Sequence, residues 1–318
     1  MKLDSHPAVS HDVLSRLEGA LGRVIRGKSD VIRLAFAALF ARGHLLIEDV
    51  PGVGKTTLAR SLACSLGCSF QRIQFTSDML PSDVIGVTVF SPQTQEFEFH
   101  PGPVFANIVL ADEINRTTPK TQSALLEAMN ETQVTANNHT YPLPQPFMVI
   151  ATQNPVEHHG TFPLPESQLD RFLMKLAIGY PPEESEKEIL HHASTPDPGM
   201  EPVITLEEVL EAQRAVSRVQ VDEELVNYAL ALVQKTRQHE SLSLGVSPRG
   251  SVSLYRAAQA AAYLDGRHYC LPDDFKNLAI PVLAHRCVVN SKHARSVREG
   301  SQAEAILREI LEEVPVPL

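Results

Sequence analysis

Short, nearly continuous apolar runs recur through the first half of the chain, and longer helical patterns separate most of them. Each run is short enough to be a strand, and none alternates cleanly between apolar and polar residues, which is typical of strands buried on both faces. Strands that alternate with helices predict an α/β fold with a parallel sheet. We therefore expect five parallel strands near His44–Ile47, Phe70–Phe75, Asn107–Ala111, Pro146–Thr152 and Leu173–Ile178.

This pattern ends at Gly179-Tyr180-Pro181-Pro182, and the chain is predicted to be helical from Glu183 onward. We place a domain boundary near residue 182, with an α/β domain at 1–182 and an all-helical domain at 183–318. Several residues in the second half are suited to cap a helix start. They are Thr205 with Glu208, Asp222 before a helix to about Gln238, Ser247 before Pro248, and Asp273-Asp274 beside Pro272.

The charge of the chain narrows the class of partner. It has 28 basic and 38 acidic residues, a net charge of −10. A nucleic-acid binder usually carries a basic stripe that neutralises phosphates, and no such stripe is visible here. The four cysteines form no CxxC pair, so a metal or disulfide framework is not indicated. We see no signal peptide and no apolar stretch of membrane-spanning length, and expect a cytoplasmic location.

The first predicted strand leads into Glu48-Asp49-Val50-Pro51-Gly52-Val53-Gly54-Lys55-Thr56-Thr57 and then a helix. Glycines let such a loop point its backbone N–H groups at a phosphate chain, and the helix dipole adds to this. Lys55 supplies a charge for the β- and γ-phosphates, and Thr56 a hydroxyl for Mg²⁺. The match to G-x-x-x-x-G-K-[ST] is incomplete, because Asp49 stands where the first Gly would be. The alternative is a Gly-rich turn with a chance Lys-Thr, which the flanking strand and helix disfavour.

A second motif, Ile108-Val109-Leu110-Ala111-Asp112-Glu113, delivers two carboxylates to the C-terminal end of a strand. Ligands bind at that end of open α/β sheets. Asp112 is expected to hold Mg²⁺ through water, and Glu113 to activate the attacking water as general base. Strands often end in solvated acids, so the spacing after the phosphate loop is what favours this interpretation.

Three polar residues could complete such a site. Asn154, after the strand that ends near Thr152, could touch the γ-phosphate or orient the water, or could simply form a turn before Pro155. Arg171 stands just before the last strand and could stabilise charge on the transferring phosphoryl group; the alternative is a surface salt bridge with Asp170. Arg249 lies in a predicted first helical turn, where the helix dipole disfavours a cation. That position favours a phosphate-binding role, with a surface ion pair as the alternative.

Together these motifs resemble the MoxR family of AAA+ ATPases. The strings EDVPGVGKTTLAR, FTSDMLPSDVIG, LADEINRTTPKTQSALLEAM, ATQNPVEHHGTFPLPESQLDRFLMK and GVSPRGSVSL carry the resemblance, which covers roughly Val24 to Val289. It implies that Gly52–Thr56 and Asp112-Glu113 are Walker A and Walker B. It also implies that Asn154 is the first sensor, Arg171 an arginine finger acting on a neighbouring subunit, and Arg249 the second sensor. Arg26 and Gly27 are similar to the segment near the adenine.

The resemblance implies further properties of the whole protein. ATP or ADP with Mg²⁺ would bind between the α/β domain and a helical lid, in a homo-oligomeric ring expected to be a hexamer. Hydrolysis would drive chaperone-like maturation, remodelling or cofactor insertion of a protein client, together with a von Willebrand factor A domain protein. Two insertions are implied, Ile85–Phe105 with a turn at Gln93-Thr94-Gln95 and Thr132–Pro144 with a turn at Asn137-Asn138. Both could face a pore or a client, or be plain surface hairpins.

Three other functions compete with this interpretation. An AAA+ ATPase acting on nucleic acid is disfavoured by the net acidity. A P-loop GTPase is disfavoured because the sequence has no Asn-Lys-x-Asp motif. A nucleotide-gated scaffold with little turnover is the third, and the presence of both Glu113 and Arg171 counts against it.

Overall fold

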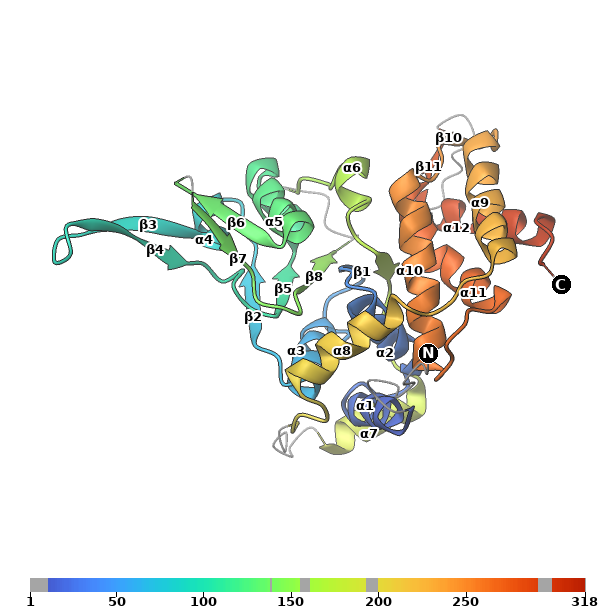
Figure 1. Cartoon of the computed structure of the whole chain (residues 1–318), viewed down its shortest axis with the longest axis horizontal. Coiled ribbons are helices and arrows are strands. Elements are labelled where there is room, and N and C mark those ends of the chain that lie inside the picture. The colour runs from blue at the N-terminus through green and yellow to red at the C-terminus, as the bar shows by residue number, and fades with distance from the viewer. Residues whose placement is uncertain (1–10, 138, 155–160, 193–199, 291–298, 318) are drawn as a thin grey trace, which may run out of the picture.

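The computed structural model describes residues 11–137, 139–154, 161–192, 200–290 and 299–317. Five strands form one parallel sheet in the order β2-β5-β8-β1-β9 (Figure 1). All five predicted strands are confirmed. Their bounds are β1 Leu45–Glu48, β2 Phe70–Gln74, β5 Ile108–Asp112, β8 Met148–Gln153 and β9 Met174–Leu176.

The inner strands send alternate side chains into two separate apolar cores. Leu45 and Ile47 of β1 belong to one core, and Leu46 between them belongs to the other. Successive side chains of a strand point to opposite faces, so a strand covered on both sides needs a continuous apolar run. The same division holds in β5, where Ile108 and Leu110 lie on one face and Val109 on the other.

β2 departs from this pattern. It is an edge strand, in which Ile73 is buried while Gln71, Arg72 and Gln74 are exposed. The expectation that every strand is buried on both faces is therefore wrong for β2. Its exposed face carries Arg72 and Gln74, whose side chains reach residues at the end of the neighbouring strand β5.

Helices cover both faces of the sheet. The first core receives side chains from α1, α2 and α3, and the second from α4 and α5. Short helical turns follow β5 and precede β9. The bounds are α1 His11–Val24, α2 Ser29–Phe40, α3 Lys55–Ser65, α4 Pro81–Ile85, η1 Ile114–Arg116, α5 Pro119–Glu131 and α6 Glu166–Leu169.

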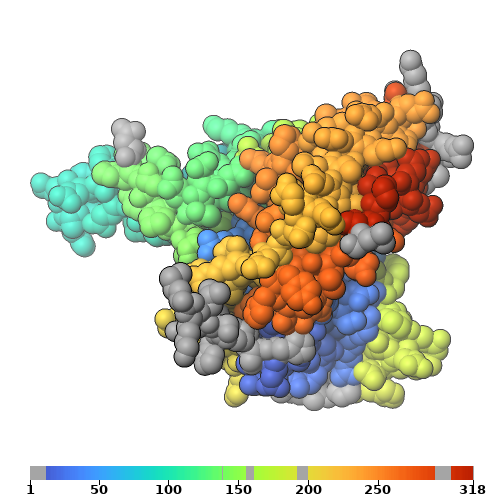
Figure 2. Space-filling view, turned by 45° about the vertical axis from the view of Figure 1, so that its right-hand side comes forward, coloured from blue at the N-terminus to red at the C-terminus, as the bar shows by residue number. Residues whose placement is uncertain are grey.

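Both predicted insertions contain antiparallel hairpins, β3 Gly86–Ser91 with β4 Glu96–Pro101, and β6 Gln133–Ala136 with β7 His139–Pro142. Gln95 and Asn137 have positive φ angles at the two turns, whereas Asn138 lies outside the described residues. The β3–β4 hairpin extends far from the body of the molecule (Figures 1 and 2). Phe99 stacks on Tyr141 with ring centroids 4.1 Å apart, so the two hairpins contact each other.

The second half is mainly helical, as predicted. Its elements are α7 Glu183–His192, α8 Leu206–Val216, α9 Glu223–Gln238, β10 Leu242–Leu244, α10 Pro248–Leu264, α11 Pro272–Leu283, η2 Ala284–Arg286, β11 Val288–Val289 and α12 Glu299–Glu313. The capping box of Thr205 and Glu208 and the caps at Asp222 and Ser247 are confirmed. The antiparallel pair of β10 and β11 is the departure from an all-helical region.

The apolar core does not break at residue 182. The first core continues through α8 to α12, and the Gln213 side chain of α8 donates a 2.8 Å hydrogen bond to the carbonyl of Leu39 in α2. The boundary near residue 182 therefore stays a prediction. Across the described ranges, no helix is both long and apolar enough to cross a membrane.

Candidate functional site

The phosphate-loop motif forms a tight turn between β1 and α3. Gly54 caps α3 in the left-handed conformation, with φ 93°, and Gly52 has φ 85°. Residues with a Cβ rarely adopt these angles, so the loop depends on glycine at both positions. The loop ends at the N-terminus of α3, where the free N–H groups and the helix dipole favour an anion.

Asp49, at the position where the general motif has glycine, ties this loop to the sheet. Its carboxylate accepts hydrogen bonds from the backbone N–H of Val50 at 2.8 Å and of Gly179 at 2.6 Å. Asp49 is only 9% exposed. Because Gly179 follows β9, the side chain connects the phosphate loop to the far edge of the sheet, a role that glycine could not perform.

The loop opens onto a cavity of about 370 Å³ that gathers most of the predicted residues. Lys55 reaches across the loop, and its Nζ donates to the carbonyl oxygens of Asp49 at 2.7 Å and Val50 at 3.2 Å. Strand ends supply the opposite wall. The cavity is lined by Pro51, Gly52, Gly54, Lys55, Thr56, Thr57, Arg72, Asp112, Glu113 and Asn154.

Asp112 is a buried carboxylate with both oxygens engaged. Its Oδ1 accepts a 2.6 Å hydrogen bond from the hydroxyl of Thr152, and its Oδ2 pairs with the guanidinium of Arg72, with Nε at 3.1 Å. Hard oxygen ligands suit Mg²⁺, which keeps several of its waters. Thr56 and Asp112 line one cavity, so the donor set fits a water-coordinated Mg²⁺.

Glu113 has an unusual backbone conformation, with φ 59° and ψ 48°. Non-glycine residues in this region cluster at functional sites, where the surroundings hold them in place. Here the backbone N–H of Glu113 donates to the hydroxyl of Thr152 at 2.9 Å. The Glu113 carboxylate accepts from Gln74 at 2.6 Å and pairs with Arg116 at 3.2 Å. From the sequence alone, Arg116 follows the Asp112-Glu113 motif with no assigned role.

Arg72 and Gln74 are site residues that the sequence analysis missed. They occupy alternate positions on the exposed face of β2 and contact Asp112 and Glu113 respectively. A signal was present, because Gln71, Arg72 and Gln74 make half of the residues from Phe70 to Phe75 polar. A strand buried on both faces does not carry two such side chains.

Asn154 is buried at the end of β8 and lines the cavity. Arg26 and Gly27 do not line it. The Arg26 guanidinium pairs with Glu188 of α7. A Cβ on Gly27 would meet Ser185 Oγ at 2.6 Å, so this segment packs tightly on the start of α7.

Arg171 lies in a different cavity, of about 290 Å³, which shares no lining residue with the first. Its Nη1 donates to the carbonyl of Leu126 in α5 at 2.9 Å, and the amide oxygen of Asn130 accepts from the same guanidinium. The alternative salt bridge with Asp170 is not what forms, because Asp170 pairs with Arg286 at 2.8 Å. Arg249, the other distal arginine, is exposed on the first turn of α10 and does not line the phosphate-loop cavity.

Comparison with known proteins agrees with this geometry. Residues 44–174 match the model of the ATPase family associated with various cellular activities, AAA, and residues 234–310 match the AAA lid domain. Chaperone MoxR1 of Mycobacterium tuberculosis is 38% identical over 93% of this chain and 80% of its own length. The chain belongs to the MoxR family of AAA+ ATPases.

Two further relatives span nearly the whole of this MoxR-family chain. The YeaC protein of Bacillus subtilis is 54% identical over 97% of this chain and 96% of its own length. A crystal structure of a candidate ATPase from Cytophaga hutchinsonii is 38% identical, covers 97% of this chain and 96% of its own, and superposes with a TM-score of 0.89. The MoxR-family chain is therefore a nucleotide-binding ATPase with an AAA domain and a lid.

Proposed function

We propose that this ATPase hydrolyses Mg²⁺-ATP in sites shared between neighbouring copies of the chain, arranged head to tail in a ring of six. The observation that carries the proposal is the position of Arg171. It lies outside the cavity that holds Lys55, Asp112 and Glu113, half-buried against α5. A head-to-tail contact joins two different surface patches, so it can set the Arg171 cavity of one copy against the phosphate loop of the next.

Within one copy, the residues that line the cavity bind the phosphate chain and Mg²⁺, and Arg26, Gly27 and Arg249, which lie outside it, take the roles that family resemblance implies. The amides of Pro51–Thr57 and the Lys55 ammonium bind the phosphate chain, and Arg249 of the lid reaches the phosphates when the lid closes. Arg26 and Gly27 lie near the adenine. Thr56 and Asp112 would hold Mg²⁺, which supplies charge neutralisation at the β- and γ-phosphates.

Glu113 takes a proton from a water molecule that Asn154 helps to orient. The water oxygen forms a bond to the γ-phosphorus as the bond from that phosphorus to the bridging oxygen breaks, which releases ADP and inorganic phosphate. Arg171 of the neighbouring copy stabilises the charge on the equatorial oxygens. Gln74 and Arg116 contact the Glu113 carboxylate and hold it at the cavity wall.

We further propose that hydrolysis serves a chaperone-like function on a protein client. The support is the relative Chaperone MoxR1, which aligns over most of both chains. Family resemblance adds a von Willebrand factor A domain protein as a partner. The exposed Phe90 and Phe97 of the β3–β4 hairpin give that insertion an apolar surface for contact with a protein.

Steady-state ATP hydrolysis as a function of protein concentration tests the shared site. Activity per chain should rise with concentration and reach a plateau, in step with assembly measured by sedimentation in the presence of ATP. Glu113→Gln should assemble without hydrolysing, and Lys55→Ala should lose nucleotide binding. A rate per chain that stays constant while the protein is monomeric would overturn the proposal.

A further inference from the structure

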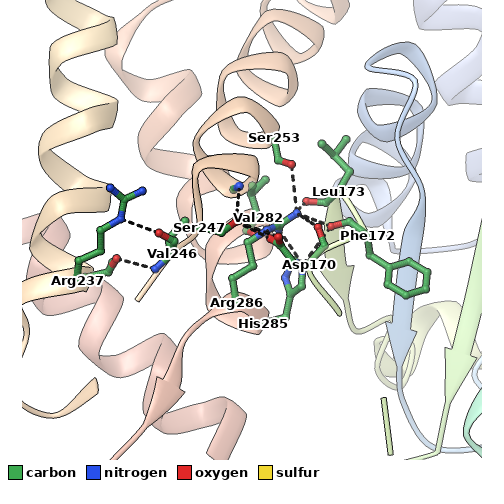
Figure 3. A network of polar contacts seen from close by, with 12 residues as sticks. Asp170, Phe172, Leu173, Arg237, Val246, Ser247, Ser253, Val282, His285 and Arg286 are labelled. Atoms are coloured by element: carbon green, nitrogen blue, oxygen red, sulfur yellow. Dashed lines mark hydrogen bonds and ion pairs between the residues drawn. The ribbon is translucent and has the colours of Figure 1, made fainter. Parts of the chain in front are cut away.

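A buried polar network joins the segment just before β9 to the helical region (Figure 3). We call it the Arg286 network, and it comprises Asp170, Ser247, Ser253 and Arg286 with the backbone carbonyls of Phe172 and Leu173. Arg286 lies at its centre with a side chain that is only 1% exposed. Burying a guanidinium is costly unless its N–H groups all find acceptors. What these groups bind should therefore indicate why the charge is there.

Most of the acceptors of Arg286 belong to one short stretch of chain. Its Nε donates to Asp170 Oδ1 at 2.8 Å, and its Nη2 donates to the carbonyls of Asp170 at 3.2 Å and Phe172 at 2.6 Å. Nη1 donates to the carbonyl of Val282 in α11, lies 2.8 Å from Nε2 of His285, and approaches the carbonyl of Leu173 at 3.3 Å. The planar guanidinium of Arg286 thus holds the backbone on both sides of residue 171.

The same network reaches the first turn of α10. The hydroxyl of Ser247 donates to the Asp170 carboxylate, with Oδ1 and Oδ2 at 3.0 and 2.9 Å, while it accepts the N–H of Gly250 as the cap of α10. α10 is the helix that carries Arg249. Ser253, one turn further along α10, accepts from Arg286 Nη2 at 3.2 Å.

Gly250 shows how closely α10 and Arg286 pack. A Cβ at this position would lie 2.8 Å from Arg286 Cδ and would also collide with Val246 Cγ1. The lid helix therefore rests directly on the arginine side chain. A shift of the first turn of α10 would displace the Arg286 side chain and, through its hydrogen bonds, residues 170 to 173.

Arg171 projects from this clamped backbone in another direction. Asp170 contacts η2 and α10, whereas the Arg171 guanidinium contacts Leu126 and Asn130 of α5. Asp170 thus holds the backbone in place, while the adjacent Arg171 presents its guanidinium on another surface. A buried ion pair contributes little net stability compared with apolar residues of the same volume, so a scaffold role alone is a weak reason for this one.

We infer that Asp170 and Arg286 are positioning residues for Arg171, and that they link its placement to the first turn of α10. This inference rests on the proposed action of Arg171 at the site of the neighbouring copy. A lid that moves with the nucleotide of its own subunit would then move the arginine offered to the next subunit. Neither Asp170 nor Arg286 lines the phosphate-loop cavity, so the loss of kcat should arise at the neighbour's site. Displacement of Arg249, which the same turn of α10 carries, would instead raise the KM for ATP at the variant's own site.

Mixing two inactive variants distinguishes a misplaced Arg171 from a chain that does not fold. Asp170→Asn alone should lose roughly tenfold or more of kcat, in the direction of Arg171→Ala, because the finger is misplaced. Its KM for ATP should stay within about twofold, since Asp170 does not line its own phosphate-loop cavity, and a larger rise would indicate that Arg249 has moved. An equimolar mixture with Glu113→Gln, which offers an intact Arg171, should recover activity to the same fraction as Arg171→Ala mixed with Glu113→Gln.

Asp274→Asn is the matched control. Asp274 is a buried carboxylate paired with Arg267 at 2.7 Å in the helical region, and its contacts lie away from residues 170 to 173. Its substitution should lower the melting temperature comparably while leaving more than half of the hydrolysis rate. A rate in Asp170→Asn that matches this control would overturn the inference.

A second variant covers the case in which Asp170→Asn does not fold. Ser247→Ala removes the hydroxyl link between α10 and Asp170 without unpairing a charge, and Thr205→Ala removes a comparable helix cap on α8. Ser247→Ala should lose several-fold in kcat and recover on mixing with Glu113→Gln, whereas Thr205→Ala should do neither. Equal behaviour of the two would overturn the inference. If Arg171→Ala itself fails to recover on mixing, the proposed shared site fails, and the inference fails with it.

Discussion

The phosphate-loop cavity and the Arg171 cavity lie on the same α/β domain but differ in chemistry. The first is about 370 Å³ and contains backbone donors, an ammonium, a guanidinium paired with Asp112, two carboxylates and a buried amide. The second is about 290 Å³ and offers one guanidinium beside Glu127, Glu131 and the Asn130 amide, with no glycine loop among its described lining residues to bind phosphate. On the proposed mechanism, the first cavity holds the nucleotide and the second contributes its guanidinium to the site of a neighbouring copy. The two cavities are then two halves of one site on separate surfaces of the chain.

Of the proposed substitutions, Arg171→Ala should have the largest effect on the rate of hydrolysis. Removing an arginine finger should lower kcat by about a thousandfold, because the transferring phosphoryl group loses its charge stabilisation. Nucleotide affinity should hardly change, since Arg171 does not line the phosphate-loop cavity. Single-turnover hydrolysis and a fluorescent-nucleotide titration measure the two quantities. An unchanged kcat would remove the second cavity from the mechanism.

Glu113→Gln tests the first cavity. Loss of the general base should reduce kcat by roughly a hundredfold or more, while ATP binding persists. The substituted amide keeps the shape of the carboxylate side chain, so the contact with Gln74 is altered but the wall of the cavity remains. A variant that hydrolyses at the parent rate would show that another group activates the water.

Asp49→Gly tests whether Asp49, which stands where the general motif has its first glycine, stabilises the fold. The change removes two hydrogen bonds from a buried carboxylate, to Val50 and Gly179, and should lower the unfolding free energy by about 2 kcal/mol. Asp49→Asn, which keeps one acceptor, should lose less. Urea denaturation measures both, and equal stability of all three proteins would contradict the structural role.

The smallest effect concerns His44, which lies at the start of β1. Its Nδ1 accepts from the N–H of Val149 at 3.0 Å and its Nε2 contacts the carbonyl of Met129 at 3.0 Å, so both ring nitrogens are satisfied in the neutral form. Burial lowers the pKa of His44 to about 4. In the unfolded chain, His44 has its ordinary pKa of about 6.5 and takes up a proton at a higher pH than in the folded protein. The free energy of unfolding therefore falls as the pH drops from about 6.5 toward 4.

By about pH 6 this group alone should cost on the order of 1 kcal/mol relative to neutral pH. His44→Gln should flatten that part of the stability curve, whereas the exposed His139 replaced by Gln should not. Thermal unfolding at a series of pH values compares the two. An identical slope in all three proteins would show that His44 does not titrate as its burial requires.

Local patterns predicted most of the fold. Continuous apolar runs identified β1, β5 and β8, whose side chains enter both cores, and also the edge strand β9. Capping residues marked the starts of α8, α9 and α10. The edge position of β2 was missed, since no local pattern says which strand lies outermost. The polar residues of the Phe70–Phe75 run indicated an exposed face, but only the pairing of β2 with β5 places Arg72 and Gln74 beside Asp112 and Glu113.

The Arg286 network could not be predicted from local sequence. Asp170 and Arg286 are 116 positions apart, and only the packing of η2 and α10 against the end of α6 brings them together. Spacing likewise identified Asp112 and Glu113 as neighbours of the phosphate loop, but not the hydroxyl of Thr152 that contacts both residues. Motifs located the residues that line the phosphate-loop cavity, and tertiary contacts determine how their side chains are held.

The most direct test of the divided site is hydrolysis in mixtures of Arg171→Ala and Glu113→Gln at constant total protein. Each variant alone should be nearly inactive. Random head-to-tail mixing pairs an intact Glu113 with a neighbour's intact Arg171 most often at equal amounts, so activity should peak there at about a quarter of the parent rate. We predict this bell-shaped dependence on the mixing ratio. A flat line at the level of the separate variants, in mixtures shown to assemble, would contradict it.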